Sequence, residues 1–384
     1  MSESTYPIRT AQSVVIDSGE AIADIATQLA PDPGSLVLFF CSSQYDLEAL
    51  TQAINTVFSD CQVIGCTSSG EIGPLGYTTG GLSAVSFPPE VLTGVAGLIH
   101  PINQFQIGEG EAFTQGLMRM LENQNNAARH HNTFAMLLID GLSQLEEPIV
   151  RSLSSALGAI PIVGGSASDD LQFDQTFIFH QGQFHSDSAL VLLATTPLRI
   201  FPFKTQHFRA TEQRLVVTAA DPTSRRVLEI NGLPAAQEYA RLVKVDLDDL
   251  NPMRFAASPV VVLIDGHEYV RSIQKANPDG SLTFYCAIDE GIVLRVAQGI
   301  DLTHNMEQAL EEVRLRIGEP YLILGNDCVL RKLEINQKGL EQEVGTLLAN
   351  ARVVGFNTYG EQFGGVHVNQ TFTGLALGSP WSKP

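Results

Sequence analysis

A short apolar run ends in a glycine-rich turn and an acid at Val63-Ile64-Gly65-Cys66-Thr67-Ser68-Ser69-Gly70-Glu71. The same pattern returns at Ile162-Val163-Gly164-Gly165-Ser166-Ala167-Ser168-Asp169-Asp170 and at Val353-Val354-Gly355-Phe356-Asn357-Thr358-Tyr359-Gly360-Glu361. A second apolar run precedes each copy and ends at Cys41, Asp140 or Cys328, which lie 24, 24 and 27 positions before the first glycine of the turn. That spacing fits two parallel strands joined by a covering helix, so the sequence predicts three β-α-β units.

Short apolar runs of β character follow each turn, and more of them fill the stretch from Val260 to Gln298. The turns Asp265-Gly266 and Asn277-Pro278-Asp279-Gly280 separate these later runs in the manner of a meander. We therefore predict an α/β fold with mixed sheets, in which repeated β-α-β units and antiparallel strands form two halves and helices cover the outer faces. The expected division is an N-terminal extension at residues 1–30, a first domain at 31–210 and a second at 211–384.

Charge and composition exclude several classes of protein. The 384 residues carry a formal net charge of −19 without a basic stripe, which disfavours binding to nucleic-acid phosphates. No apolar run is long enough to cross a membrane, and residues 1–17 lack the apolar core of a signal peptide. Five cysteines, an odd number, favour a reducing compartment over a disulfide framework. We expect a cytoplasmic protein that binds neither nucleic acid nor membrane.

Small polar residues gather where the predicted parallel strands end. Because ligands of β-α-β units bind beyond the carboxyl ends of the strands, these turns are expected to line a pocket for a small polar molecule. The residues predicted to line it are Ser42, Thr67, Ser68, Gly165 and Ser166. The alternative is that glycine and serine only build tight turns here. Neither G-x-x-x-x-G-K nor G-x-G-x-x-G occurs, so nucleotide binding has no direct support.

Cysteines and histidines suggest two kinds of metal centre. Cys41, Cys66 and Cys328 fall at the ends of equivalent predicted strands, where convergence would make a metal or iron–sulfur site, although buried cysteine also serves as a small hydrophobe. His207 lies among aromatic residues, and His367 lies in a strand with alternating polar positions. Each is a candidate haem ligand, with a hydrogen-bonded strand histidine as the alternative. No G-x-S-x-G elbow or H-E-x-x-H pair occurs, so we do not expect an enzyme, and a hydrolase remains the enzymatic alternative.

Several of these blocks are similar to those of a known sensory family. The first turn resembles the hallmark of the FIST N-terminal domain, and Gly355-Phe356-Asn357-Thr358-Tyr359-Gly360-Glu361-Gln362 resembles that of the FIST C-terminal domain. Other blocks resemble the nitric-oxide-sensing (NosP) group of the family, namely Asp140-Gly141-Leu142-Ser143, Gly164-Gly165-Ser166-Ala167, Lys204-Thr205-Gln206-His207-Phe208, Asp327-Cys328-Val329-Leu330-Arg331 and His367-Val368-Asn369-Gln370-Thr371-Phe372. The resemblance extends roughly from Leu36 to Gly378. Ser68 departs from it, since the first hallmark more often has Ala or Gly there.

This resemblance implies a cytosolic sensor of nitric oxide that binds haem b and regulates a separate partner. The partner would be a histidine kinase or a cyclic-di-GMP enzyme (a diguanylate cyclase or phosphodiesterase), with biofilm control downstream. His207 or His367 would supply the axial ligand because both lie inside the similar blocks, and Arg209 and Arg331 would pair with the haem propionates. Two alternatives stay open, a metal-free module for an amino-acid-like molecule and an iron–sulfur sensor that uses the three cysteines. A homodimer is among the expected assemblies.

Overall fold

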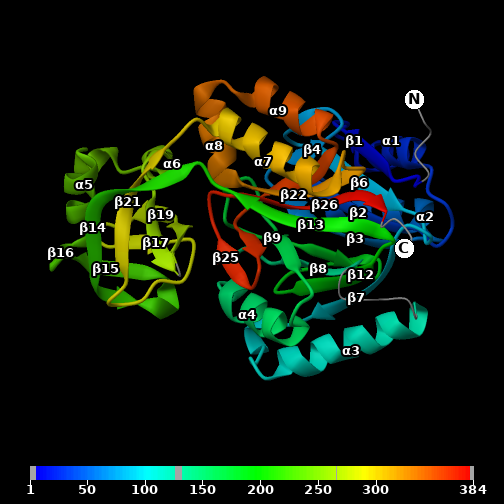
Figure 1. The fold of residues 1–384 in the computed structure, drawn as a ribbon, viewed down its shortest axis with the longest axis horizontal. Helices are drawn as coiled ribbons and strands as arrows, with labels where there is room; N and C mark the ends of the chain where they lie inside the picture. Colours follow the sequence, from blue (N-terminus) through cyan, green and yellow to red (C-terminus); the bar gives the residue numbers. More distant parts are fainter. Residues whose placement is uncertain (1–5, 126–131, 265, 381–384) are drawn as a thin grey trace.

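The computed structural model of the chain describes residues 6–125, 132–264 and 266–380. Figure 1 shows a body of packed sheets and helices that contains both ends of the sequence, and a smaller lobe beside it coloured green to yellow. The body consists of three units with the same order of elements, and the lobe is a domain inserted into the third unit. The predicted α/β fold with mixed sheets is confirmed.

Each unit follows the order strand, helix, strand, helix, strand, two-stranded hairpin, strand. The first unit comprises β1 (Arg9–Ser13), α1 (Ser18–Leu29), β2 (Leu36–Ser42), α2 (Leu47–Val57), β3 (Gln62–Ser68), β4 (Glu71–Gly73), β5 (Gly76–Thr78) and β6 (Leu82–Phe87). The second comprises β7 (Thr93–Ile99), α3 (Glu109–Gln124), β8 (Thr133–Ile139), α4 (Glu146–Leu157), β9 (Ile162–Ser166), β10 (Ile178–His180), β11 (Gln183–His185) and β12 (Ala189–Thr195). Residues 1–30, expected as an extension, therefore contain the first strand and helix of a unit.

The third unit is interrupted and has its second helix in two pieces. It comprises β13 (Leu198–Thr205), then after the inserted domain α7 (Leu302–Ile317), β22 (Leu322–Cys328), α8 (Val329–Lys338), α9 (Glu341–Asn350), β23 (Val353–Thr358), β24 (Glu361–Phe363), β25 (Val366–Val368) and β26 (Phe372–Pro380). The parallel pairs β2–β3, β8–β9 and β22–β23 confirm the predicted β-α-β units. The repeated glycine has a packing cause, because a Cβ at Gly65, Gly164 or Gly355 would collide with a backbone carbonyl oxygen of the paired strand.

The hairpin that follows each glycine-rich turn leaves its own sheet and joins another. β4–β5 pairs with β23 of the third unit, β10–β11 pairs with β3 of the first, and β24–β25 pairs with β9 of the second. The resulting strand orders are β1-β6-β2-β3-β10-β11, β25-β24-β9-β8-β12-β7 and β13-β26-β22-β23-β4-β5. The exchange is cyclic, so every unit gives one hairpin and receives one.

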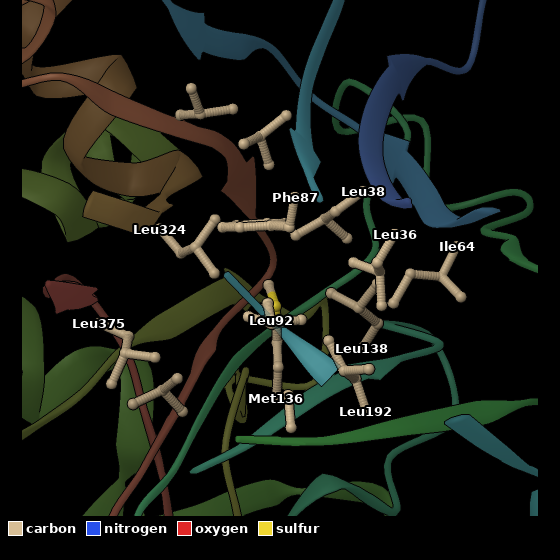
Figure 2. Packing of buried hydrophobic residues seen from close by; sticks show 14 of the residues in the cluster. Leu36, Leu38, Ile64, Phe87, Leu92, Met136, Leu138, Leu192, Leu324 and Leu375 are labelled. Atoms are coloured by element: carbon tan, nitrogen blue, oxygen red, sulfur yellow. The ribbon is translucent and has the colours of Figure 1, made fainter. Parts of the chain in front are cut away.

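The inner faces of the three sheets meet in a shared apolar core. Figure 2 shows part of this core, to which Leu38 of β2, Leu138 of β8 and Leu324 of β22 each contribute a side chain. Helices cover the outer faces as predicted, with α1 and α2 on the first sheet, α3 and α4 on the second, and α7, α8 and α9 on the third. Buried polar residues replace the apolar ones toward the carboxyl ends of the parallel strands, and the candidate site lies there.

The inserted domain lies between β13 and α7 and has its own apolar core. It comprises β14 (Phe208–Asp221), β15 (Arg226–Ile230), β16 (Leu233–Pro234), α5 (Ala235–Val243), α6 (Pro252–Ala257), β17 (Val260–Ile264), β18 (His267–Arg271), β19 (Ile273–Ala276), β20 (Leu282–Phe284) and β21 (Val293–Gly299). Its strands form one sheet, and the β17–β18 hairpin falls within the predicted meander. The expected division at residues 210 and 211 falls just after β14 begins, and the chain returns to the third unit at α7.

Candidate ligand-binding site

The glycine-rich turns lie side by side, and backbone hydrogen bonds connect them. Asn357 N–H donates to the carbonyl oxygen of Gly70 over 2.8 Å, and Ser168 N–H donates to that of Thr67 over 3.2 Å. The predicted pocket residues Ser42, Thr67, Ser68 and Ser166 are buried, and each hydroxyl has a hydrogen-bond partner within the protein. Gly165 faces Thr358 so closely that a Cβ would not fit. All five residues lie at the carboxyl ends of β2, β3 and β9, where they contact other parts of the protein.

Two buried acids hold these turns from within. Glu71 accepts hydrogen bonds from Ser68 Oγ over 2.7 Å and from Gly81 N over 2.9 Å, while the hydroxyl groups of Thr358 and Thr371 donate to Glu361. Burial raises the pKa of Glu71 to about 7 and that of Glu361 to about 8. The acid at the end of the second turn differs, because Asp170 is only partly buried.

The three cysteines predicted as a cluster do not converge. Cys41 lies in the apolar cluster beneath α1 and α2, Cys66 lies in the shared core, and Cys328 lies in a cluster with residues of α6 and α8. Strand alternation separates the first two, because they point to opposite faces of one sheet. Among the described residues, no group of three His, Cys, Asp or Glu side chains is arranged to hold a metal ion. An iron–sulfur centre does not fit these thiols.

One buried polar network joins His207 to Arg331. Arg331 is fully buried on α8, where its Nε donates to Asp327 Oδ1 over 2.7 Å and its Nη1 donates to His207 Nδ1 over 3.0 Å. His207 Nε2–H donates to Glu334 Oε2 over 2.8 Å. Tyr77, from the hairpin of the first unit, donates to the other oxygen of Asp327. Burial lowers the pKa of His207, and both ring nitrogens have hydrogen-bond partners.

This network fixes the two connections to the inserted domain. His207 lies between β13 and β14, and its carbonyl oxygen accepts a hydrogen bond over 2.7 Å from Ile300 N, just after β21. Its side chain is hydrogen-bonded to Arg331 and Glu334 of α8, so both connections are attached to this helix. Arg209 lies two residues further along and is exposed on β14. Of the residues predicted to bind a cofactor, the structure therefore brings His207 and Arg331 together as partners of each other and leaves Arg209 apart.

A second buried polar network contains His367 and Ser166. Gln362 bridges them, since its Nε2 donates to Ser166 Oγ over 2.9 Å and to His367 Nδ1 over 3.2 Å. Asn369 lies beside the ring, because His367 Nε2 and Asn369 Nδ2 both come within 3.0 Å of the point where a side chain on Gly360 would begin. We call Ser166, Gln362, His367 and Asn369 the His367 site. It lies at the carboxyl end of β9, to which β24 is paired.

Four polar atoms of the His367 site are buried without a hydrogen-bond partner. They are His367 Nε2, Gln362 Oε1 and both amide atoms of Asn369, in residues that are at most 1% exposed. In the network around His207, only Arg331 Nη2 lacks a partner. A buried polar group left unpaired costs about 1–3 kcal/mol. Asn326 and Thr373, paired across β22 and β26, contribute three further unpartnered atoms, and the His367 site contributes four.

Charged residues of the inserted domain close this site. Arg225 binds Glu146 and Glu147 at the start of α4, with 2.7 Å between its Nη2 and Glu146 Oε2. Arg271 Nη1 donates to the carbonyl oxygen of His367 over 3.4 Å. Burial lowers the pKa of His367 to about 4, although the nearby Glu147 carboxylate acts in the opposite direction, so the imidazole is neutral at pH 7. The side chains of the site are thus uncharged, and charged groups of two domains lie near them.

Comparison with known proteins identifies the family. Residues 35–233 match the FIST N domain, and residues 235–364 match the FIST C domain. The chain belongs to the FIST family. FIST domains are a sensory family, so the chain is a sensory protein. An uncharacterized protein of Methanocaldococcus jannaschii is 25% identical over 226 residues, which cover 55% of the FIST chain and 43% of the relative. The chain thus spans less than half the length of that relative.

Haem fits neither predicted histidine of the FIST chain in this conformation. Both ring nitrogens of His207 are bonded to other side chains. His367 Nε2 is unpartnered, but a Cβ on Gly360 would lie only 2.6 Å from it, which leaves no room for a porphyrin on that side. Arg331, expected to pair with a propionate, is buried against Asp327. No described helix of this FIST protein has the length and apolar character to cross a membrane.

Gln362 and Asn369 are site residues that were not predicted from the sequence. Gln362 pairs with His367 across the β24–β25 hairpin, so the two side chains lie on one face, and Asn369 follows directly after β25. The opposite face carries Phe363 and Val368. A polar pair on one face of the hairpin, followed directly by an asparagine, was the signal that could have revealed the site.

A surface groove of about 740 Å³ lies elsewhere, between α2, α3 and the tip of β10–β11. Its carboxamides on Asn55, Gln124, Gln181 and Gln183 belong to exposed residues that solvent can satisfy. The polar atoms of the His367 site have no such access. We therefore place the candidate site of this FIST protein at His367.

Proposed function

We propose that this FIST protein senses a small polar molecule, which it binds at the His367 site, and that a separate protein reads the result. The observation that carries the proposal is the set of four buried, unpartnered polar atoms on and next to the β24–β25 hairpin, which pairs with β9 near its carboxyl end. Ligands of parallel β-α-β units bind at such ends. A bound polar molecule would give each of these atoms a hydrogen bond. Binding would thereby remove the free-energy cost of burying them unpaired.

The inserted domain supplies the means of signalling. The site is buried, and we place the route of ligand entry at the contacts of Arg225 and Arg271 with the body. A ligand that fits best with the domain docked then shifts the equilibrium toward docking by its difference in affinity between the two states. A histidine kinase, or a diguanylate cyclase or phosphodiesterase, would read the docked state. The resemblance to the nitric-oxide-sensing group motivates this choice of partner.

Two neighbouring carboxamides provide a matched test. Asn369→Leu removes both unpartnered amide atoms at similar size, so the unliganded protein is expected to become more stable while losing its response to ligand. Gln370→Met is the control, because Gln370 donates to Ala256 O and accepts from Ser272 Oγ. It is expected to lower the free energy of unfolding. Urea unfolding measures both, and an equal loss in Asn369→Leu would remove the basis of the proposal.

A haem-based sensor of nitric oxide is the second candidate, favoured by the unpartnered Nε2 of His367. It requires the β24–β25 hairpin to move, since Gly360 now closes the space in front of that nitrogen. An anaerobic absorption spectrum of protein expressed with ample haem and iron tests it before and after nitric oxide. A stoichiometric Soret band that shifts with nitric oxide and is lost in His367→Ala supports haem. A protein without a stoichiometric chromophore refutes it.

A further inference from the structure

The hydrogen-bonding groups of the His367 site specify the chemistry of its ligand. Because Gln362 Nε2 donates to His367 Nδ1, the ring proton is on Nε2, and Nε2–H is an unused donor. Asn369 adds an unused amide donor and an unused carbonyl acceptor, and Gln362 Oε1 is a second unused acceptor. The site thus presents two donors and two acceptors.

This balance does not depend on which way the Gln362 amide is turned. In the reverse orientation the amide oxygen accepts from the Ser166 hydroxyl and from His367 Nδ1–H. The NH₂ group of Gln362 then faces the site as a donor, and His367 Nε2 becomes an acceptor. The count is again two donors and two acceptors. A ligand that has only acceptors, or only donors, leaves two of the four atoms unpaired in either orientation.

Most of the surrounding charges are already paired. Arg225 binds Glu146 and Glu147, and Glu147 also accepts from Ala287 N–H over 2.6 Å. Arg271 donates to the carbonyl oxygen of His367 over 3.4 Å. The four side chains of the site itself carry no charge, so an ion placed among them would lose its hydration, which is strongly unfavourable. The arrangement therefore selects an uncharged ligand.

We infer that the ligand is a small uncharged molecule that carries a carboxamide or urea group, since one such group offers acceptors and donors side by side. This inference rests on the proposed ligand-binding role of the His367 site and adds the class of molecule. Gly360 lies against His367 Nε2, so a ligand of this site has to be small. By the ceiling on affinity per heavy atom, a four-atom amide binds no tighter than on the order of tens of micromolar.

Three isosteric probes test the class of ligand on the full chain. Acetamide, acetate and acetamidinium share one shape and differ in charge and in hydrogen-bonding groups. At a concentration about a hundredfold above its Kd, acetamide is expected to raise the melting temperature by about 3 °C and to slow amide exchange in β24–β25. Acetate and acetamidinium are expected to do neither. Asn369→Leu should abolish the acetamide effect and thereby exclude a general solvent effect.

The outcomes separate the class of ligand from the site itself. If acetate or acetamidinium binds as well as acetamide, and Asn369→Leu abolishes that binding, the site stands and the uncharged class is wrong. If no probe changes the melting temperature or the amide exchange of the wild-type protein, both the class and the ligand-binding role of the site are overturned. Asn369→Asp provides an independent check, because a carboxylate at this position should shift the preference from acetamide to acetamidinium.

Discussion

Replacing Glu361 by glutamine should make the stability of this protein less sensitive to alkaline pH. The carboxyl group is buried at the end of the third glycine-rich turn, and burial raises its pKa from 4.5 to about 8. A group whose pKa is raised on folding holds its proton more tightly in the folded chain. Its contribution is therefore fully favourable below pH 4.5 and is lost as the pH rises through about 8.

The size of the effect follows from those two pKa values. At about 1.36 kcal/mol for a pKa difference of one, the carboxyl lowers the free energy of unfolding by on the order of 2 kcal/mol at pH 6 and 5 kcal/mol at pH 9. Glutamine fits the same place, because its oxygen can accept from Thr371 N–H and its NH₂ can donate to Thr358 Oγ1. The stability of Glu361→Gln relative to the wild type should therefore rise by about 3 kcal/mol from pH 6 to pH 9.

Urea unfolding followed by circular dichroism at pH 6, 7.5 and 9 measures this difference. Glu71→Gln is the matched variant, since Glu71 occupies the equivalent turn with a pKa of about 7, and its difference should rise by only about 1 kcal/mol. Glu122→Gln, at an exposed position on α3, is the control. A difference for Glu361→Gln that stays constant from pH 6 to pH 9 would refute the reasoning, because the carboxyl would then not titrate in the folded protein.

Three further predictions concern other buried groups. Asp327→Asn leaves the buried guanidinium of Arg331 without its counter-charge and should lower the free energy of unfolding by about 3–5 kcal/mol in urea, whereas a loss below 1 kcal/mol would contradict the pairing. Arg225→Gln removes the guanidinium that binds Glu147 across the domain interface. Amide exchange should therefore become faster in β24–β25 and stay unchanged in α1. If β24–β25 exchanges at the same rate in the variant and in the wild type, this contact does not close the site. Only Cys61 should react readily with Ellman's reagent in the native protein, because the other four thiols are buried; fast reaction of a second thiol would count against this packing.

The sequence allowed the repeated part of the fold to be predicted, because one glycine recurs for one physical reason. At Gly65, Gly164 and Gly355, the neighbouring parallel strand leaves no space for a Cβ, and the spacing to the preceding strand sets the length of the crossover. The partner of the following hairpin could not be predicted in this way. Strand alternation gives the two faces of β24 and β25, but it does not say which sheet receives them.

The candidate site was predicted only in part for the same reason. Ser166 and His367 were both expected to be functional. They come together because a hairpin of the third unit pairs with β9 of the second, and because Gln362 forms hydrogen bonds with both side chains. Cys41 and Cys66 illustrate the opposite error. Both lie near the ends of adjacent strands, but alternation sends them to different faces, so shared position along a strand does not imply contact.

The cyclic exchange of hairpins has a consequence for how this architecture can be divided. A fragment that ends after the second unit would leave β9 without its partner hairpin, and a fragment that begins at the second unit would leave β23 without one. Such exposed sheet edges favour aggregation. In a ring of three copies, a single unit would find a partner for its hairpin and for the strand that receives one, so the fold has the connectivity of a homotrimer joined into one polypeptide.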